Sequence, residues 1–187
     1  MCRRKTAAMQ TIEAMCARHE FDKEELAVKA KMLLKSYRQI CWTALGSFEV
    51  SADENYCLSK TDIAKAIAYL YAYEADTDRR QFEQTMESMF DSKWIIEVVD
   101  SAMLQVHEFP DDGNLYFEIL QKMFLGRCRY VESELLDILQ IERSRFYERK
   151  KEAVIIFGLA LWGTVLPNIA SMMEDDPPLS YAECEIF

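Results

Sequence analysis

The stretch that decides the fold runs from Glu132 to Leu166 and reads ESELLDILQIERSRFYERKKEAVIIFGLALWGTVL. Leucines at helical spacing come first, a short break follows, and a basic segment then continues into a long apolar run. That run, from Ala153, has about 14 residues, whereas a membrane-spanning helix requires roughly 20. We therefore expect a short helix, a tight turn and a long helix whose second half is buried in a protein core.

A further helix is expected directly before this stretch. Asn114 follows a turn-forming segment and can cap a helix that continues to Leu125, where Gly126 ends it. Its inward positions are Leu115, Ile119 and Met123. Three helices with a short second member, a tight turn at 140–142 and a basic third member have the layout of a helix-turn-helix. In that motif the third helix enters the major groove of DNA.

The segment Glu134–Ala153, ELLDILQIERSRFYERKKEA, resembles the helix-turn-helix of sigma factor region 4 and of the related ArpU/RinA-type phage transcriptional regulators. The resemblance covers about residues 114–157 and implies promoter binding by a small regulator encoded on a prophage or mobile element. Two positions depart from the family pattern, because Gln140 replaces a turn glycine and Glu142 replaces a helix-capping serine. The first replacement is tolerable if the turn avoids positive φ, and the Glu142 carboxylate can cap the third helix while it repels the DNA backbone.

The predicted DNA-binding residues fall into two groups. Those expected to face the major groove are Arg143, Ser144, Arg145, Tyr147 and Arg149. Those expected to hold flanking phosphates are Arg127, Arg129, Lys150 and Lys151. The predicted partner is double-stranded promoter or operator DNA, and a homodimer is expected because one module this small reads only a half-site.

Charge is distributed unevenly along the chain. The segment from Lys122 to Lys151 has eight basic and five acidic residues, whereas the whole chain has a net charge of −10. Phosphate binding requires local positive potential, which this segment can supply. The alternative interpretation is a solvated helix face, on which Glu148 and Glu152 pair with the cations.

Glycine and proline are scarce, with five and four residues, and this favours helices over a turn-rich sheet. We predict an all-α protein, in which an N-terminal helical bundle precedes a helix-turn-helix module whose third helix runs on into a buried apolar segment. The predicted segments are N-terminal helices with a loop (1–58), central helices (59–110), the module (111–170) and a C-terminal tail (171–187).

Helix starts are marked by capping residues ahead of apolar stripes. Asp22 precedes a predicted helix from Lys23 to about Leu45, and Ser59 precedes one that ends near Ala75. The other expected elements are a short helix or frayed arm at 8–18, a loop at 46–56, a helix after Asp78 and another from about Lys93.

No pattern indicates catalysis, a metal or a cofactor. The six cysteines form no C-x-x-C pair, and His19 and His107 lie far apart without further ligands at metal spacing. Glycine-rich phosphate loops and hydrolase motifs are absent from the sequence, so we predict a protein that is not an enzyme. We interpret the cysteines as free thiols in a reducing cytoplasm. The tryptophans, Trp42, Trp94 and Trp162, are expected to pack in the core rather than stack on bases.

A competing hypothesis follows from the acidic composition. A small acidic protein suits a phage-encoded inhibitor, anti-CRISPR-like, whose carboxylates occupy the basic nucleic-acid channel of a host nuclease. The contact residues would be Asp53, Glu54, Glu74, Asp76, Asp78, Glu83 and Glu87. Contact with RNA polymerase is a third alternative, and no membrane partner is expected.

Overall fold

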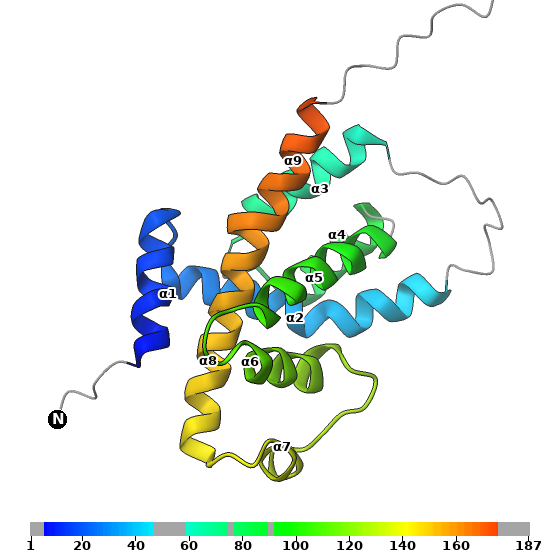
Figure 1. Ribbon diagram of the computed structural model, residues 1–187. Helices are drawn as coiled ribbons and strands as arrows, with labels where there is room; N and C mark the ends of the chain where they lie inside the picture. The colour runs from blue at the N-terminus through cyan, green and yellow to red at the C-terminus, as the bar shows by residue number, and fades with distance from the viewer. Residues whose placement is uncertain (1–5, 47–58, 75–76, 90–91, 176–187) are drawn as a thin grey trace, which may run out of the picture.

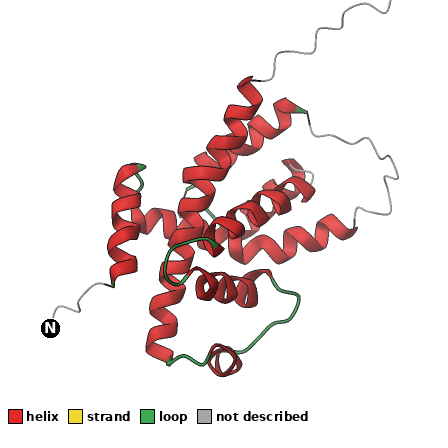
Figure 2. Cartoon of the chain, viewed as in Figure 1, coloured by secondary structure: helices red, strands yellow, loops and turns green. Residues whose placement is uncertain are grey.

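A computed structural model describes residues 6–46, 59–74, 77–89 and 92–175, and within these ranges every element is a helix (Figures 1 and 2). The all-α prediction is confirmed. Gly46 of the predicted loop is the last residue of a helix, and residues 47–56 of that loop, together with residues 176–187 of the predicted tail, lie outside the described residues. In chain order the elements are α1 (Ala7–Arg18), α2 (Lys23–Gly46), α3 (Lys60–Ala72), α4 (Arg79–Met89), α5 (Ser92–His107), α6 (Gly113–Leu120), a π-helical turn (Gln121–Leu125), α7 (Glu132–Leu139), α8 (Arg143–Ala160), a second π-helical turn (Leu161–Val165) and α9 (Leu166–Asp175).

The predicted capping residues begin their helices. The Asp22 carboxylate accepts a hydrogen bond from the Glu25 N–H, and the Ser59 hydroxyl accepts one from the Asp62 N–H. Helix α3 ends three residues earlier than predicted, because Tyr73 turns to extended backbone, buries its ring and donates from its hydroxyl to the Lys29 carbonyl. The core thus gains an aromatic ring where periodicity alone predicted another helical turn.

The start of α6 differs from the prediction. The helix begins at Gly113, with Asp112 as its N-cap and Asn114 exposed within its first turn. Asp112 does not cap with its side chain, since its carboxylate lies 2.8 Å from Arg149 on α8. The helix continues to Leu125 as predicted, but its last turn is π-helical.

One continuous helix, made of α8, the second π turn and α9, runs through the whole molecule (Figure 1). Its span from Arg143 to Met173 is long and apolar enough to cross a membrane, but 67% of its most apolar window is buried inside the protein. This is the burial expected of a core helix in a soluble protein.

Helices α1, α2, α5 and α6 pack around α8, and one large core extends from Ile12 to Leu166. Gly158 allows α2 to approach closely, because a Cβ at this position would lie 2.8 Å from the Leu26 side chain. Since this core draws on the first three predicted segments, they pack together rather than as separate units.

The three tryptophans do not share one environment. Trp94 and Trp162 are buried, and the Trp162 indole donates to the Leu70 carbonyl at 2.9 Å. Trp42 is 75% exposed, so the prediction that it packs in the core is wrong. The reason is its place on α2, where it lies off the apolar stripe that includes Tyr37.

Candidate nucleic-acid interface

Helices α6, α7 and the start of α8 share a small core of their own. It is formed by Ile119, Leu135 and Phe146, one from each helix, all at most 2% exposed. Partly buried side chains surround it: Leu115, Met123, Leu136, Leu139 and Ile141. In Figure 1, α7 is seen nearly end on while α8 lies across the view, so the two axes cross at a large angle. The predicted inward residues of α6 thus hold α7 against α8.

The turn between α7 and α8 is the predicted three-residue one, but its conformation is not. Gln140 adopts φ 51° and ψ 43°, so the turn does not avoid positive φ, which was the condition for tolerating this residue in place of glycine. This conformation ends α7, and the Gln140 and Ile141 N–H groups both donate to the Leu136 carbonyl. Burial of Ile141 in the small core offsets the strain of a left-handed non-glycine residue. Glu142 is the N-cap of α8, but its side chain makes no capping hydrogen bond, contrary to expectation.

The first turn of α8 carries three of the predicted base-reading residues, Arg143, Ser144 and Arg145, and all three are exposed. Arg143 and the following Tyr147 both contact Glu132 of α7, at 2.8 Å from the guanidinium and 2.5 Å from the hydroxyl. The hydrogen bond from Tyr147 lowers the pKa of Glu132, and Arg143 lowers it further. Glu132 therefore stays ionised and neutralises Arg143 at this surface.

Arg149 does not lie on this surface, although the sequence placed it in the major groove. Its side chain is 14% exposed, forms an ion pair with Asp112, and donates to Glu152 at 2.7 Å. The buried Glu152 carboxylate also accepts from the hydroxyls of Tyr116 and Thr6. A buried carboxylate requires a cation and hydrogen-bond donors, so this network fixes Arg149 inside the protein.

The predicted phosphate-binding residues are divided between two places. Lys150 lies on the α2 side of α8, with its ammonium about 6 Å from the ring centres of Phe146 and Tyr147. Lys151 is exposed, with its nearest carboxylate oxygen 3.9 Å away on Glu24. Arg127 and Arg129 are exposed in the segment that joins the π turn to α7.

Sequence reasoning missed a basic stripe on α2. Lys31, Lys35, Arg38 and Trp42 recur at intervals of four, three and four residues, which places them on one face of the helix. The same periodicity that identifies apolar stripes could have found this one. Lys31 and Lys35 line the same cavity as Lys150, and both lower the pKa of that group.

Two adjoining cavities lie along this stripe. The first, of about 670 Å³, is lined by four cations, Lys35, Arg38, Arg79 and Arg129, and has no carboxylate in its lining. The second, of about 680 Å³, shares Lys35, Arg79 and Phe124 with the first and adds Lys31, Lys150 and Lys151. Glu24, at its far end, is the acidic residue of its lining. The predicted residues Arg129, Lys150 and Lys151 thus belong to a continuous basic groove between α2 and the start of α8.

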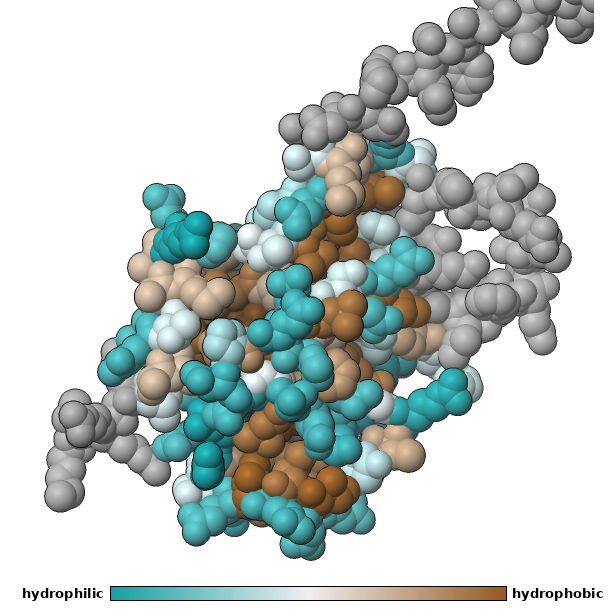
Figure 3. Space-filling view, viewed as in Figure 1, coloured by the Kyte–Doolittle hydropathy of each residue, from teal (hydrophilic) through white to brown (hydrophobic). Residues whose placement is uncertain are grey.

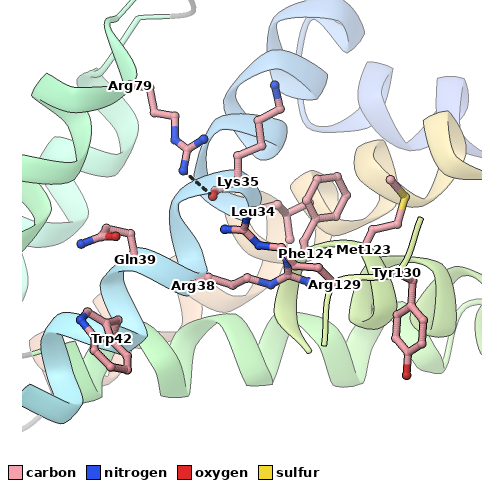
Figure 4. A pocket seen from close by; sticks show the side chains of 10 residues that line it. All are labelled: Leu34, Lys35, Arg38, Gln39, Trp42, Arg79, Met123, Phe124, Arg129 and Tyr130. Atoms are coloured by element: carbon pink, nitrogen blue, oxygen red, sulfur yellow. Dashed lines mark hydrogen bonds between the residues drawn. The ribbon is translucent and has the colours of Figure 1, made fainter. Parts of the chain in front are cut away.

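Figure 4 shows the first cavity from close by, with Arg38 and Arg129 converging at its middle and Trp42 and Tyr130 on either side. Arg38 donates to the carbonyls of Gly126 and Cys128, so it also holds the segment that carries Arg129. Burial lowers the pKa of Arg38, and the neighbouring Arg129 lowers it further.

Apolar surface also accompanies the interface. Figure 3 shows a brown area flanked by teal over the part of the molecule where Figure 1 places α7 and the start of α8. Ile138 and Val131 are exposed large apolar residues of this region. Among the residues that the structure describes, no group of three or more histidine, cysteine or acidic side chains could hold a metal ion. Comparisons of the chain with protein-family models, curated protein sequences and solved structures find no match.

The structure describes only some of the residues of the competing inhibitor hypothesis. Asp53, Glu54 and Asp76 lie outside them. Asp78 caps α4 by accepting from the Arg80 N–H, and Glu83 is paired with Arg79 at 2.7 Å. These two carboxylates are therefore already used within α4.

Proposed function

We propose that the protein binds duplex DNA through the start of α8 and acts as a transcriptional regulator of helix-turn-helix type. The observation that carries this proposal is the junction of α7 and α8. The three-residue turn and the small core shared with α6 hold α7 across α8 and leave the first turn of α8 exposed. A recognition helix requires such an exposed N-terminal turn, because its first residues contact the base edges.

The proposed roles follow the exposure of each side chain. Arg145 and Ser144 contact bases, and Arg143 joins them when DNA displaces its partner Glu132. Lys151 and Arg127, both exposed, contact DNA phosphates that flank the major groove. Arg149 has no DNA contact in this proposal, and its role is to hold α8 on α6 through Asp112.

The test is selection of bound sequences from a random duplex library at low salt, with the purified full-length protein. We expect an enriched motif, and Arg145→Ala should weaken binding to it by about tenfold or more, since a bidentate arginine–guanine contact contributes roughly 1–3 kcal/mol. Arg18→Ala is the matched control, because Arg18 is an exposed cation at the end of α1. Equal effects of the two substitutions would show that the start of α8 is not part of the DNA interface.

A second candidate function is the acidic inhibitor of a nucleic-acid-handling host protein. It is favoured by the net charge of −10, and by the ion pairs of Arg143 with Glu132 and of Lys151 with Glu24, which reduce the attraction of α8 for DNA. Absence of duplex binding at low salt, with binding to a nuclease that carries a basic channel, would support this function instead.

A further inference from the structure

The groove along α2 combines three features that no role at the start of α8 requires. It holds four cations that form no salt bridge with the described residues, it is hollowed into two cavities, and it carries an exposed tryptophan. Its α2 lining extends from Glu24 to Trp42, which corresponds to about 27 Å along the helix axis. It is therefore long enough for a chain-like ligand rather than a single small ion.

The positive charges of the groove repel one another in the absence of a ligand. Lys31, Lys35, Lys150 and Arg129 form no salt bridge within the described part of the chain. Burial lowers the pKa of Lys150, Lys31 and Lys35 lower it further, and Glu132 opposes this shift. Positive potential that the neighbouring carboxylates offset only in part, in a protein of net charge −10, favours a polyanion at this place.

The aromatic side chains indicate what kind of polyanion fits. Trp42 is 75% exposed and Tyr130 is 38% exposed, and they lie on either side of the converging guanidiniums of Arg38 and Arg129 (Figure 4). Exposed aromatic rings beside a cationic groove are the arrangement by which proteins stack successive bases of a single strand. In a duplex the bases already stack on one another, so their faces could not reach these rings.

We infer that the groove between α2, α4 and the start of α8 binds single-stranded nucleic acid, with its phosphates along Lys31 and Lys35 and a base stacked on Trp42. The site does not include the proposed base-reading residues Ser144 and Arg145, because neither lines a cavity, whereas Lys151 lines the second cavity and also contacts phosphates of the duplex in the proposal above. Binding at the groove and at the start of α8 can therefore be lost separately.

Tryptophan fluorescence of the full chain provides a direct readout. The chain has three tryptophans, and since Trp94 and Trp162 are buried, Trp42 is the one that a base can reach. The probes are a 16-nucleotide oligothymidylate and the matching oligouridylate, which distinguish DNA from RNA, together with a duplex of equal length and heparin as a polyanion without bases.

We expect the single strands to quench the fluorescence and heparin to leave it unchanged. Trp42→Ala should weaken single-strand binding by about 5- to 100-fold, and Trp42→Phe should restore most of it, because phenylalanine also stacks. With four unpaired cations in contact with phosphates, the slope of log K against log salt should be about −3, and Lys35→Gln should reduce it by about 0.7.

Arg129 and Arg127 provide a matched pair, since both are exposed in one short segment but only Arg129 lines a cavity. Arg129→Ala should weaken oligothymidylate binding, and Arg127→Ala should not. Absence of quenching, equal quenching by heparin, or equal loss in the two arginine variants would overturn the inference. Arg145→Ala should leave oligothymidylate binding intact, so failure of the duplex proposal would be recognised separately.

Discussion

The start of α8 and the middle of α2 both carry basic side chains, but they differ in how these are paired. On α8, Arg143 faces Glu132, and Arg149 is enclosed by Asp112 and Glu152. On α2, Lys31 and Lys35 have no salt bridge within the described ranges and face Lys150. The start of α8 is thus the more basic of the two in sequence, but more of its cations are neutralised by carboxylates in the structure.

The difference shows that a count of charges along a segment does not measure the potential available to a ligand. Arg149 adds one positive charge to the segment from Lys122 to Lys151, yet that charge is used to solvate a buried carboxylate. Lys35 lies in an ordinary amphipathic helix, yet it lines both cavities of the groove. Pairing and burial decide which cations a nucleic acid can reach.

The largest expected effect separates Arg149 from its neighbour Arg145. Arg149→Ala should lower the free energy of unfolding by about 3–5 kcal/mol, because it leaves Glu152 buried without its cation. Arg145→Ala should change it by no more than about 0.5 kcal/mol, as for other exposed side chains. Urea unfolding of both variants measures the difference. Equal stabilities would show that Arg149 is not part of a buried network.

A smaller effect is expected when a paired cation on α8 is released. Glu132→Gln removes the carboxylate that neutralises Arg143, so duplex binding at low salt should strengthen several-fold, up to about tenfold. Fluorescence anisotropy with a labelled duplex measures this gain. Asp137→Asn, which removes one exposed charge from the same helix, is the control. A similar gain in both variants would reflect net charge alone.

Substitutions in the turn between α7 and α8 should have a smaller effect. Gln140→Gly relieves the left-handed strain at φ 51° and should raise the free energy of unfolding by about 0.5–1 kcal/mol. Gln140→Ala should give no such gain, because alanine retains a Cβ in this conformation. Thermal unfolding of the two variants provides the comparison, and a gain with alanine would contradict the explanation by backbone strain.

The smallest effect concerns the groove itself. Because the pKa of Lys150 is lowered in the folded protein, the unfolded chain binds more protons, and this group makes stability rise as pH increases toward the usual lysine value of 10.5. Lys150→Met should remove that rise, which is below about 1 kcal/mol for a group screened by solvent. The difference in the free energy of unfolding between wild type and variant, followed from about pH 8 to 10.5, measures this effect. A difference of the opposite sign would mean that Lys150 is stabilised as a cation.

Much of the fold was predictable from local patterns. Asp22 and Ser59 begin their helices as expected, and α7 and α8 begin at the predicted residues. These features depend on interactions within a few residues, which a sequence displays directly. The left-handed turn at Gln140 was not predictable in this way, because it depends on burial of Ile141 in a core that three helices create.

The candidate site was less predictable, for a related reason. The exposure of Ser144 and Arg145 agrees with their expected position at the start of α8. The enclosure of Arg149 depends on Asp112, and the groove depends on α4 and α8 approaching α2, so both arise from contacts between distant segments. Trp42 could have been recognised, because it lies four residues after Arg38 on the basic stripe and off the apolar one.

The central claim is that the first turn of α8 binds duplex DNA, and the most direct test is a binding titration with the duplex selected from a random library. We expect salt-sensitive binding that Arg145→Ala weakens by about tenfold or more and Arg18→Ala leaves unchanged. Absence of duplex binding at low salt, or equal binding by the wild-type protein and Arg145→Ala, would contradict it.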